Sequence, residues 1–123
     1  MMGVHEEALR QLSALRDDFA AQLGGLADDI ALDWEAVRAS SGQTAGLKGL
    51  IERVHRLSGN AGFFGFNEVS RAAMALEAAL DRWLAGAPPD QGDIQDLCRL
   101  VATLHSLAAA AASDDATSGL ASS

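Results

Sequence analysis

The stretch from His55 to Phe66, HRLSGNAGFFGF, combines an imidazole with three glycines that follow it at offsets of four, seven and ten residues. A neutral imidazole is a competent nucleophile near neutral pH. Glycine costs a helix interior about 1 kcal/mol relative to alanine, so three regularly spaced glycines need a reason. If the stretch is helical, Gly59 and Gly62 lie one and two turns beyond His55 on nearly the same side. The spacing therefore predicts a surface cleared of side chains beside an accessible histidine.

The third glycine and the aromatic residues around it have their own expected roles. Gly65 should let the chain turn into the next helix, because glycine adopts backbone conformations closed to other residues. Most of the cluster Phe63, Phe64 and Phe66 should pack at this junction, and Phe63 is the candidate for an apolar contact with a partner. Helix geometry alone also fits a plain helix end with a merely exposed histidine, so both interpretations stay open at this point.

Other arrangements of reactive side chains are incomplete. Glu52 and His55 have the Glu-x-x-His spacing of di-iron four-helix bundles, but neither His5 nor His105 has an acidic residue three positions before it. Cys98, the only cysteine, precedes His105 by seven residues, which is about 10.5 Å along a helix and too far for a nucleophile pair. His105 is therefore expected to be a half-buried structural histidine, and no metal site is expected.

Composition narrows the class of protein. The chain has 123 residues, a net charge of −8 and few aromatic residues, which favours one helical domain and argues against a basic face for nucleic acid. No apolar run approaches the roughly 20 residues of a membrane span, and the acidic, amphipathic N-terminal segment leads us to expect no signal peptide. A single cysteine suits a reducing compartment. We expect a cytoplasmic protein without membrane or nucleic-acid partners.

Apolar residues recur at helical spacing in four segments. The first runs from about Glu6 to Arg38 as one long helix, straight or bent at Gly24-Gly25, or as two helices with a corner there. Its stripe comprises Leu12, Leu15, Phe19, Leu23, Leu26, Ile30, Trp34 and Val37. The second begins near Ala45, the third runs from about Asn67 to Leu84 with Asn67 as N-cap, and the fourth starts between Asp90 and Asp93.

Four amphipathic helices with short connections predict an all-α, antiparallel four-helix bundle. The bundle is expected to form a single domain over residues 1–112. From Ser113 onward the composition turns to Ser, Asp, Thr and Gly, so residues 113–123 are predicted to form a disordered C-terminal tail.

The pattern His55-x-Leu57-x-Gly59-x-x-Gly62-x-x-Gly65-Phe66, followed by a helix bearing Ala75-Leu76-Glu77, resembles the histidine-containing phosphotransfer (HPt) domain of bacterial phosphorelays. The resemblance covers about Leu15 to Ala112. It implies that His55 accepts a phosphoryl group from an aspartyl phosphate on the receiver domain of a hybrid histidine kinase. His55 would then pass the group to the receiver aspartate of a response regulator.

The resemblance also implies a phosphocarrier without a nucleotide, metal or organic cofactor of its own. No phosphate-binding glycine loop or kinase signature occurs, so autonomous kinase activity is not expected. The receiver would supply Mg²⁺ and the cationic residues that neutralise the transferring phosphoryl group. The alternative is a non-catalytic adaptor that binds a receiver or kinase without carrying phosphate. The chain is expected to be a monomer.

One position departs from the family pattern. Many members carry lysine three residues after the histidine, where this chain has Ser58. A serine hydroxyl could donate a hydrogen bond to a phosphoryl group, but it brings no charge. Lys48, two turns before His55, and Arg56 beside it are the candidates for local positive potential, although a solvated surface cation is the more usual explanation for either.

Overall fold

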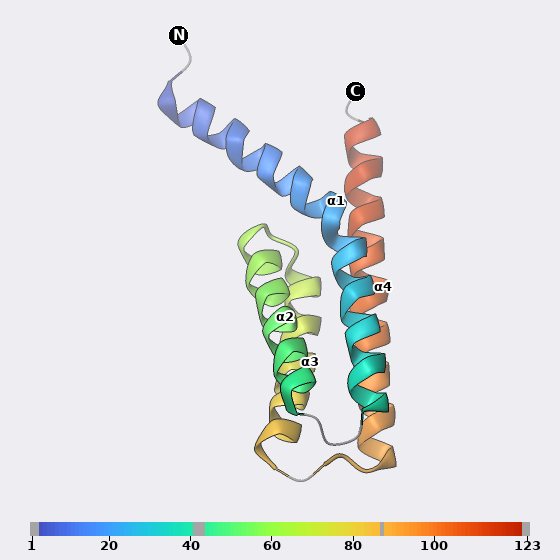
Figure 1. The fold of residues 1–123 in the computed structure, drawn as a ribbon. Coiled ribbons are helices and arrows are strands. Elements are labelled where there is room, and N and C mark those ends of the chain that lie inside the picture. The colour runs from blue at the N-terminus through green and yellow to red at the C-terminus, as the bar shows by residue number, and fades with distance from the viewer. Residues whose placement is uncertain (1–2, 41–43, 87, 122–123) are drawn as a thin grey trace.

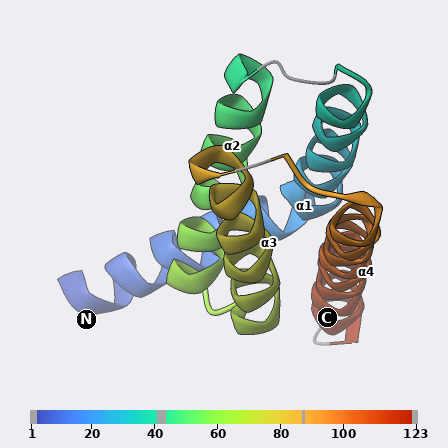
Figure 2. The same cartoon turned by 90° about the horizontal axis from the view of Figure 1, so that it is seen from below.

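The computed structural model describes the backbone of residues 3–40, 44–86 and 88–121, and side chains as far as Ser113. Within these residues the chain forms four helices and no strand: α1 (Val4–Ala39), α2 (Thr44–Phe63), α3 (Asn67–Ala85) and α4 (Gln91–Ala121). Each helix runs antiparallel to the next (Figure 1). Seen along the bundle, α1 and α4 lie on one side and α2 and α3 on the other (Figure 2). The predicted all-α four-helix bundle is confirmed.

The core is built from the apolar stripes that the helical spacing predicts, because residues three and four apart share one helix face. Its largest fully buried side chains come from all four helices: Leu23, Ile30, Trp34, Leu50, Val54, Val69, Leu76, Leu80 and Leu104. Contacts are most extensive between α2 and α3 and between α1 and α4. The molecule is thus two closely packed helix pairs joined face to face.

The first helix is continuous, so the two-helix alternative is wrong. α1 bends near its middle without breaking (Figure 1), as a glycine pair permits. Its apolar stripe is buried only from Phe19 onward, whereas Leu12 and Leu15 on the same stripe are 45% and 53% exposed. We call residues 4–18 the N-terminal arm, because this part of α1 projects from the bundle with its apolar face uncovered.

The corner between α2 and α3 depends on Gly65. Its φ of +84° is the only positive value among the described residues, in a region that glycine adopts without strain. The amide of Phe66 donates to the carbonyl of Ala61 at 2.8 Å, and that of Gly65 donates to Gly62 at 3.2 Å. This is the Schellman pattern of a helix end, so the predicted turn at Gly65 is confirmed.

Arg16, at the base of the arm, ties α1 to this corner. Its Nε donates to the carbonyl oxygen of Phe64 at 3.2 Å, and its guanidinium lies 4.4 Å from the centre of the Phe66 ring. Phe19 stacks on Phe64 one turn further along α1. A cation over an aromatic face and a charged hydrogen bond both favour this contact, which fixes the point at which the arm leaves the bundle.

The N-terminal end of α3 differs in one detail from the sequence prediction. Asn67 is the first residue of α3 rather than its N-cap, and Phe66 occupies the cap position without a side-chain hydrogen bond. The turn at Gly65 already sets the direction of the chain, so α3 begins without a side-chain cap.

The start of α4 has a reciprocal cap. The Asp90 carboxylate accepts from the amide of Asp93 at 2.8 Å, and the Asp93 carboxylate accepts from the amide of Asp90 at 3.2 Å.

The backbone of α4 remains helical to Ala121, where the composition predicts a disordered tail from Ser113. The reason is local. Alanine, which forms the run Ala108–Ala112, has the highest helix propensity of any residue type, and each residue added to an established helix contributes one hydrogen bond. Residues 122 and 123 lie outside the described residues. The domain boundary at residue 112 stays a prediction.

Candidate functional site

His55 lies in the middle of α2, at the edge of its buried stripe. Val54, its neighbour in sequence, is fully buried, whereas the His55 side chain is 72% exposed. A step of one residue turns a helix by about 100°, which carries the imidazole from the core to the margin. The structure therefore places His55 in the accessible position that helix periodicity predicts.

The His55 ring is held by a residue that sequence reasoning assigned no role. Its Nδ1 lies 2.8 Å from Oε2 of Glu77 on α3, whose side chain is only 21% exposed. An ionised carboxylate only accepts hydrogen bonds, so Nδ1 carries the proton and donates. In the neutral ring this leaves Nε2 with its lone pair, and Nε2 has no partner among the described residues. The pair selects the tautomer and leaves Nε2 as the free nitrogen of an exposed ring.

The pairing of Glu77 with His55 could have been predicted from the distances of the two residues from the corner along the chain. His55 lies eleven residues before Phe66 at the corner, and Glu77 lies eleven residues after it. In an antiparallel hairpin, residues equidistant from the corner face each other, and both residues adjoin the centre of a buried stripe. Gly62 and Ser70, four residues on either side of Phe66, meet in the same register.

The two glycines that follow His55 have different surroundings. A Cβ atom at Gly59 would meet nothing within 4 Å, so this position is open to solvent as predicted. A Cβ at Gly62 would lie 3.2 Å from Oγ of Ser70 on α3, closer than side chains normally pack. Gly59 therefore clears the surface beside the imidazole, whereas Gly62 lets α2 and α3 approach each other.

Ser58 does not present its hydroxyl to the surface beside His55. The residue is 7% exposed, and its Oγ donates to the carbonyl of His55 at 2.8 Å. The Ser58 carbonyl in turn accepts from Oγ of Ser70 at 2.9 Å. Serine in a helix commonly bonds back to the preceding turn, and position 58 falls on the core side. The geometry does not support the predicted contact between Ser58 and a phosphoryl group.

Lys48 and Arg56 are exposed, and neither forms an ion pair with another described residue. Arg53, on the opposite side of α2, is instead held by Asp29 at 3.4 Å and Asp33 at 2.7 Å on α1. Since a paired guanidinium is partly neutralised, Lys48 and Arg56 are the uncommitted positive charges of α2 near His55.

The three aromatic residues divide as predicted. Phe66 is buried and Phe64 half-buried against Phe19, whereas Phe63 is 72% exposed two turns beyond His55. Phe63 therefore offers an apolar surface on the same helix as the imidazole and the open position at Gly59.

His105 forms a second histidine–carboxylate pair on the other side of the bundle. Its Nε2 lies 2.5 Å from Oδ1 of Asp28 on α1, and the side chains are 44% and 64% exposed. Asp28 thus contacts Nε2 of His105, the ring nitrogen that has no partner in His55. The half-buried, partnered environment agrees with the structural role predicted for His105.

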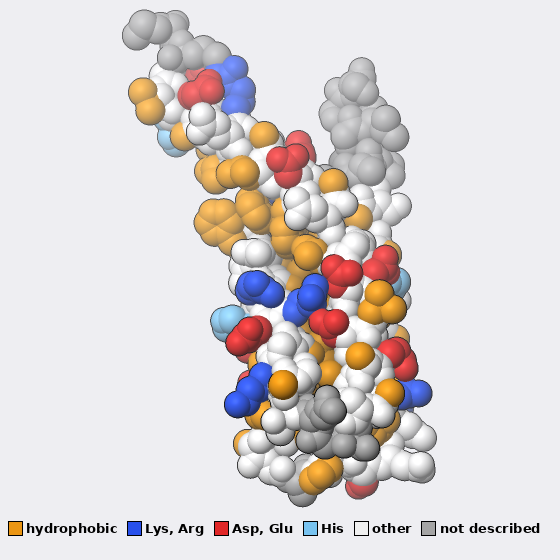
Figure 3. Space-filling view, in the orientation of Figure 1, with side chains coloured by type: hydrophobic (Ala, Val, Ile, Leu, Met, Phe, Trp, Pro, Cys, Tyr) orange, Lys and Arg blue, Asp and Glu red, His pale blue; other side chains and the backbone are white. Residues whose placement is uncertain are grey.

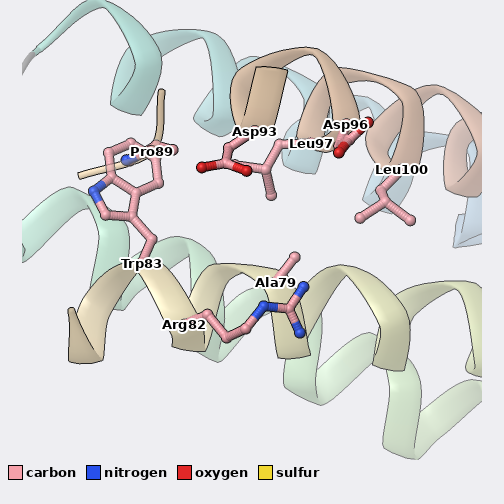
Figure 4. Close-up of a pocket in the computed structure, with 8 residues that line it drawn as sticks. All are labelled: Ala79, Arg82, Trp83, Pro89, Asp93, Asp96, Leu97 and Leu100. Carbon is pink, nitrogen blue, oxygen red and sulfur yellow. The ribbon is translucent and has the colours of Figure 1, made fainter. Parts of the chain in front are cut away.

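A groove of about 260 Å³ lies between α3 and α4 but does not include His55. In it Arg82 projects from α3 below two carboxylates of α4 (Figure 4). Its lining consists of Ala79, Arg82, Trp83, Pro89, Asp93, Asp96, Leu97 and Leu100. No histidine, serine or cysteine lines this groove, and the surface around the exposed His55 on α2 is the candidate site.

Metal binding and membrane insertion are two further classes of function to consider. Among the residues that the structure describes, no group of three or more His, Cys, Asp or Glu side chains is arranged to hold a metal ion. None of the described helices combines the length and apolar character needed to cross a membrane.

Comparison with known proteins gives one match. The family model of the Hpt domain matches residues 6–114, while no curated protein and no solved structure matches the chain significantly. Hpt domains are phosphocarriers of two-component phosphorelays, which exchange phosphoryl groups with receiver domains and have no kinase activity. A match over most of the chain, on a four-helix bundle with an exposed histidine, shows that the chain belongs to the Hpt domain family.

Proposed function

We propose that His55 is the phosphoryl-carrying residue of this Hpt domain. The hydrogen bond from Nδ1 to Glu77, which leaves Nε2 free and exposed, carries the proposal. The donor is the aspartyl phosphate of a receiver domain in a hybrid histidine kinase. The acceptor is the receiver aspartate of a response regulator.

The transfer needs no proton to move in its first step. The Nε2 lone pair attacks phosphorus, the bond to the receiver's aspartyl oxygen breaks, and the aspartate leaves as a carboxylate. The ring then carries a phosphoryl group on Nε2, a proton on Nδ1 and a positive charge. Glu77 stabilises this charge at 2.8 Å, because hydrogen bonds between charged groups are about twice as strong as neutral ones. Attack by a second receiver's carboxylate reverses these steps.

The chain contributes positioning and the receiver contributes the strong electrostatics. Mg²⁺ and the cations that neutralise the transferring phosphoryl group come with the receiver. Lys48 and Arg56, which are exposed and unpaired among the described residues, add local positive potential beside the imidazole. The open position at Gly59 lets the receiver reach the reacting distance of about 3–3.5 Å.

The test is phosphotransfer from a phosphorylated receiver. The wild-type chain should acquire a label that is acid-labile and base-stable, as expected of phosphohistidine, and a second receiver should remove it. A folded chain that binds the receiver but acquires no label would make it the adaptor instead. Label that persists in His55→Gln would move the site to another residue.

A further inference from the structure

The hydroxyl of Ser70 on α3 lies in the space that Gly62 leaves open on α2. A Cβ atom at Gly62 would lie 3.2 Å from Oγ and 3.8 Å from Cβ of Ser70. The hydroxyl donates a part-buried hydrogen bond of 2.9 Å to the carbonyl of Ser58 on α2. Glycine costs a helix about 1 kcal/mol relative to alanine, and the contact with Ser70 gives a reason for that cost at position 62.

Ser58 connects this contact to the turn of α2 that carries His55. Its carbonyl accepts from Ser70, and its own hydroxyl donates to the carbonyl of His55 at 2.8 Å, one turn back. Ser58 is 7% exposed, and hydrogen bonds away from water are stronger than those in water. The backbone that carries the imidazole is therefore joined to α3 through two serine hydroxyls.

The two polar contacts between α2 and α3 have the same spacing on both helices. Gly62 follows His55 by seven residues, and Glu77 follows Ser70 by seven residues. Seven residues are close to two turns and rise about 10.5 Å, so both members of each pair lie on nearly the same side of their helix. The position of α3 along α2 at which Ser70 meets Gly62 is therefore the position at which Glu77 meets His55.

Other contacts set this position less precisely. The core of the bundle consists of apolar side chains, and the hydrophobic effect has no directional preference. Charged side chains gather on the surface over the middle of α1 and α2 (Figure 3), but exposed ion pairs join long, flexible side chains and contribute little. A serine side chain is short, and its hydrogen bond is lost once the two heavy atoms are more than about 3.5 Å apart.

We infer that Ser70 is a positioning residue for His55. Its hydrogen bond to the Ser58 carbonyl holds α3 at the register in which the Glu77 carboxylate lies 2.8 Å from Nδ1 of the ring. Ser70 lies two turns from Glu77, so it acts on the ring through the placement of that carboxylate. Its effect on phosphotransfer rests on the function proposed for His55, whereas its effect on the ring does not.

Nitrogen-15 NMR of the His55 ring tests the inference without phosphate. Above the ordinary titration range of histidine, the wild-type ring should show one tautomer, with the proton on Nδ1. Ser70→Ala adds no atom and removes one hydrogen bond, so it should fold, and its His55 ring should show a mixture of both tautomers. Ser70→Thr keeps the hydroxyl and should retain the wild-type tautomer.

Ser40→Ala is the matched control for the loss of a serine hydroxyl. Ser40 is half-buried like Ser70, and its hydroxyl donates to the carbonyl of Val37 at 3.1 Å, at the end of α1. Its removal should leave the His55 ring as in the wild type. Circular dichroism of each variant should show native helicity, which confirms that the ring signals are compared in folded chains.

A double-mutant cycle of phosphotransfer tests whether Ser70 acts through Glu77. Ser70→Ala should slow acceptance from a phosphorylated receiver about 2- to 10-fold, the range of one neutral hydrogen bond. In a Glu77→Ala background the same change should have no further effect, because the carboxylate that Ser70 positions is then absent.

Two outcomes would overturn the inference. One is a folded Ser70→Ala variant whose His55 ring keeps the wild-type tautomer. The other is equal slowing by Ser70→Ala with and without Glu77, which would assign Ser70 a general structural role. A wild type that accepts no phosphate would instead contradict the proposed function, and the NMR comparison would still decide the role of Ser70.

Discussion

Among the side chains that the structure describes, two histidine–carboxylate pairs differ in which ring nitrogen is held. On the α2–α3 side, Glu77 holds Nδ1 of His55 and leaves Nε2 free. On the α1–α4 side, Asp28 holds Nε2 of His105. Nδ1 adjoins the carbon that joins the ring to the main chain, whereas Nε2 lies at the far end of the ring. The free nitrogen of His55 therefore points outward, and that of His105 points back towards its own helix.

The surroundings of the two pairs reinforce this difference. The His55 side chain is 72% exposed and its carboxylate only 21%, whereas His105 is 44% exposed and Asp28 64%. In the first pair a half-buried carboxylate holds an exposed ring, and in the second an exposed carboxylate covers a half-buried ring. One turn beyond, His55 has Gly59 and His105 has Ala109. A carboxylate beside a histidine thus does not by itself leave the outer ring nitrogen free.

Removing each ring separates the two pairs most strongly. His55→Gln should reduce phosphoryl acceptance from a labelled receiver to background, while His105→Gln should leave it unchanged. Circular dichroism should show native helicity for His55→Gln, because the side chain lies outside the core. Loss of acceptance in folded His105→Gln would mean that both pairs take part in transfer.

Crowding the surface beside each ring should give the next largest effect. Gly59→Gln should fold but slow transfer by about two orders of magnitude, because a displacement of about 1 Å from the reacting geometry has that cost. Gly59→Ala adds only a methyl group to open space and should transfer normally. Ala109→Gln, the equivalent position beside His105, is the control and should have no effect. Normal transfer by Gly59→Gln would refute the cleared surface.

The two carboxylates provide a finer comparison. Glu77→Ala removes a charged hydrogen bond worth about 1.5–3 kcal/mol, so transfer should slow about 10- to 100-fold. Glu77→Gln keeps an acceptor for Nδ1 and should recover part of the rate. Asp28→Asn should not change the rate. Equal rates for Glu77→Ala and the wild type would show that tautomer selection is unimportant.

The two glycines of the site give the smallest effect, and it concerns stability. Gly59→Ala should raise the free energy of unfolding by up to about 1 kcal/mol. Gly62→Ala should lower it, because the new methyl group lies 3.2 Å from a Ser70 hydroxyl that is held by the Ser58 carbonyl. In a Ser70→Ala background the Gly62→Ala change should be harmless. Equal costs in both backgrounds, measured by chemical denaturation, would exclude the proposed crowding.

Helical periodicity by itself determined the four helices, their apolar stripes and the marginal position of His55. These are properties of single helices: the angle between Val54 and His55 follows from 100° per residue whatever lies opposite. The turn at Gly65 was likewise local, since only glycine adopts its φ of +84° at little cost. The family pattern added the function proposed for this histidine.

Only the tertiary structure decided which atoms meet between helices and where the bundle ends. Glu77, the close approach at Gly62 and the inward turn of Ser58 all depend on the register of α2 against α3. The same apolar period runs through the whole of α1, yet Phe19 is buried and Leu15 exposed. Periodicity tells which side of a helix is apolar, but burial requires a neighbouring helix beside it. The N-terminal arm extends beyond the α2–α3 corner, where no described helix covers its apolar side.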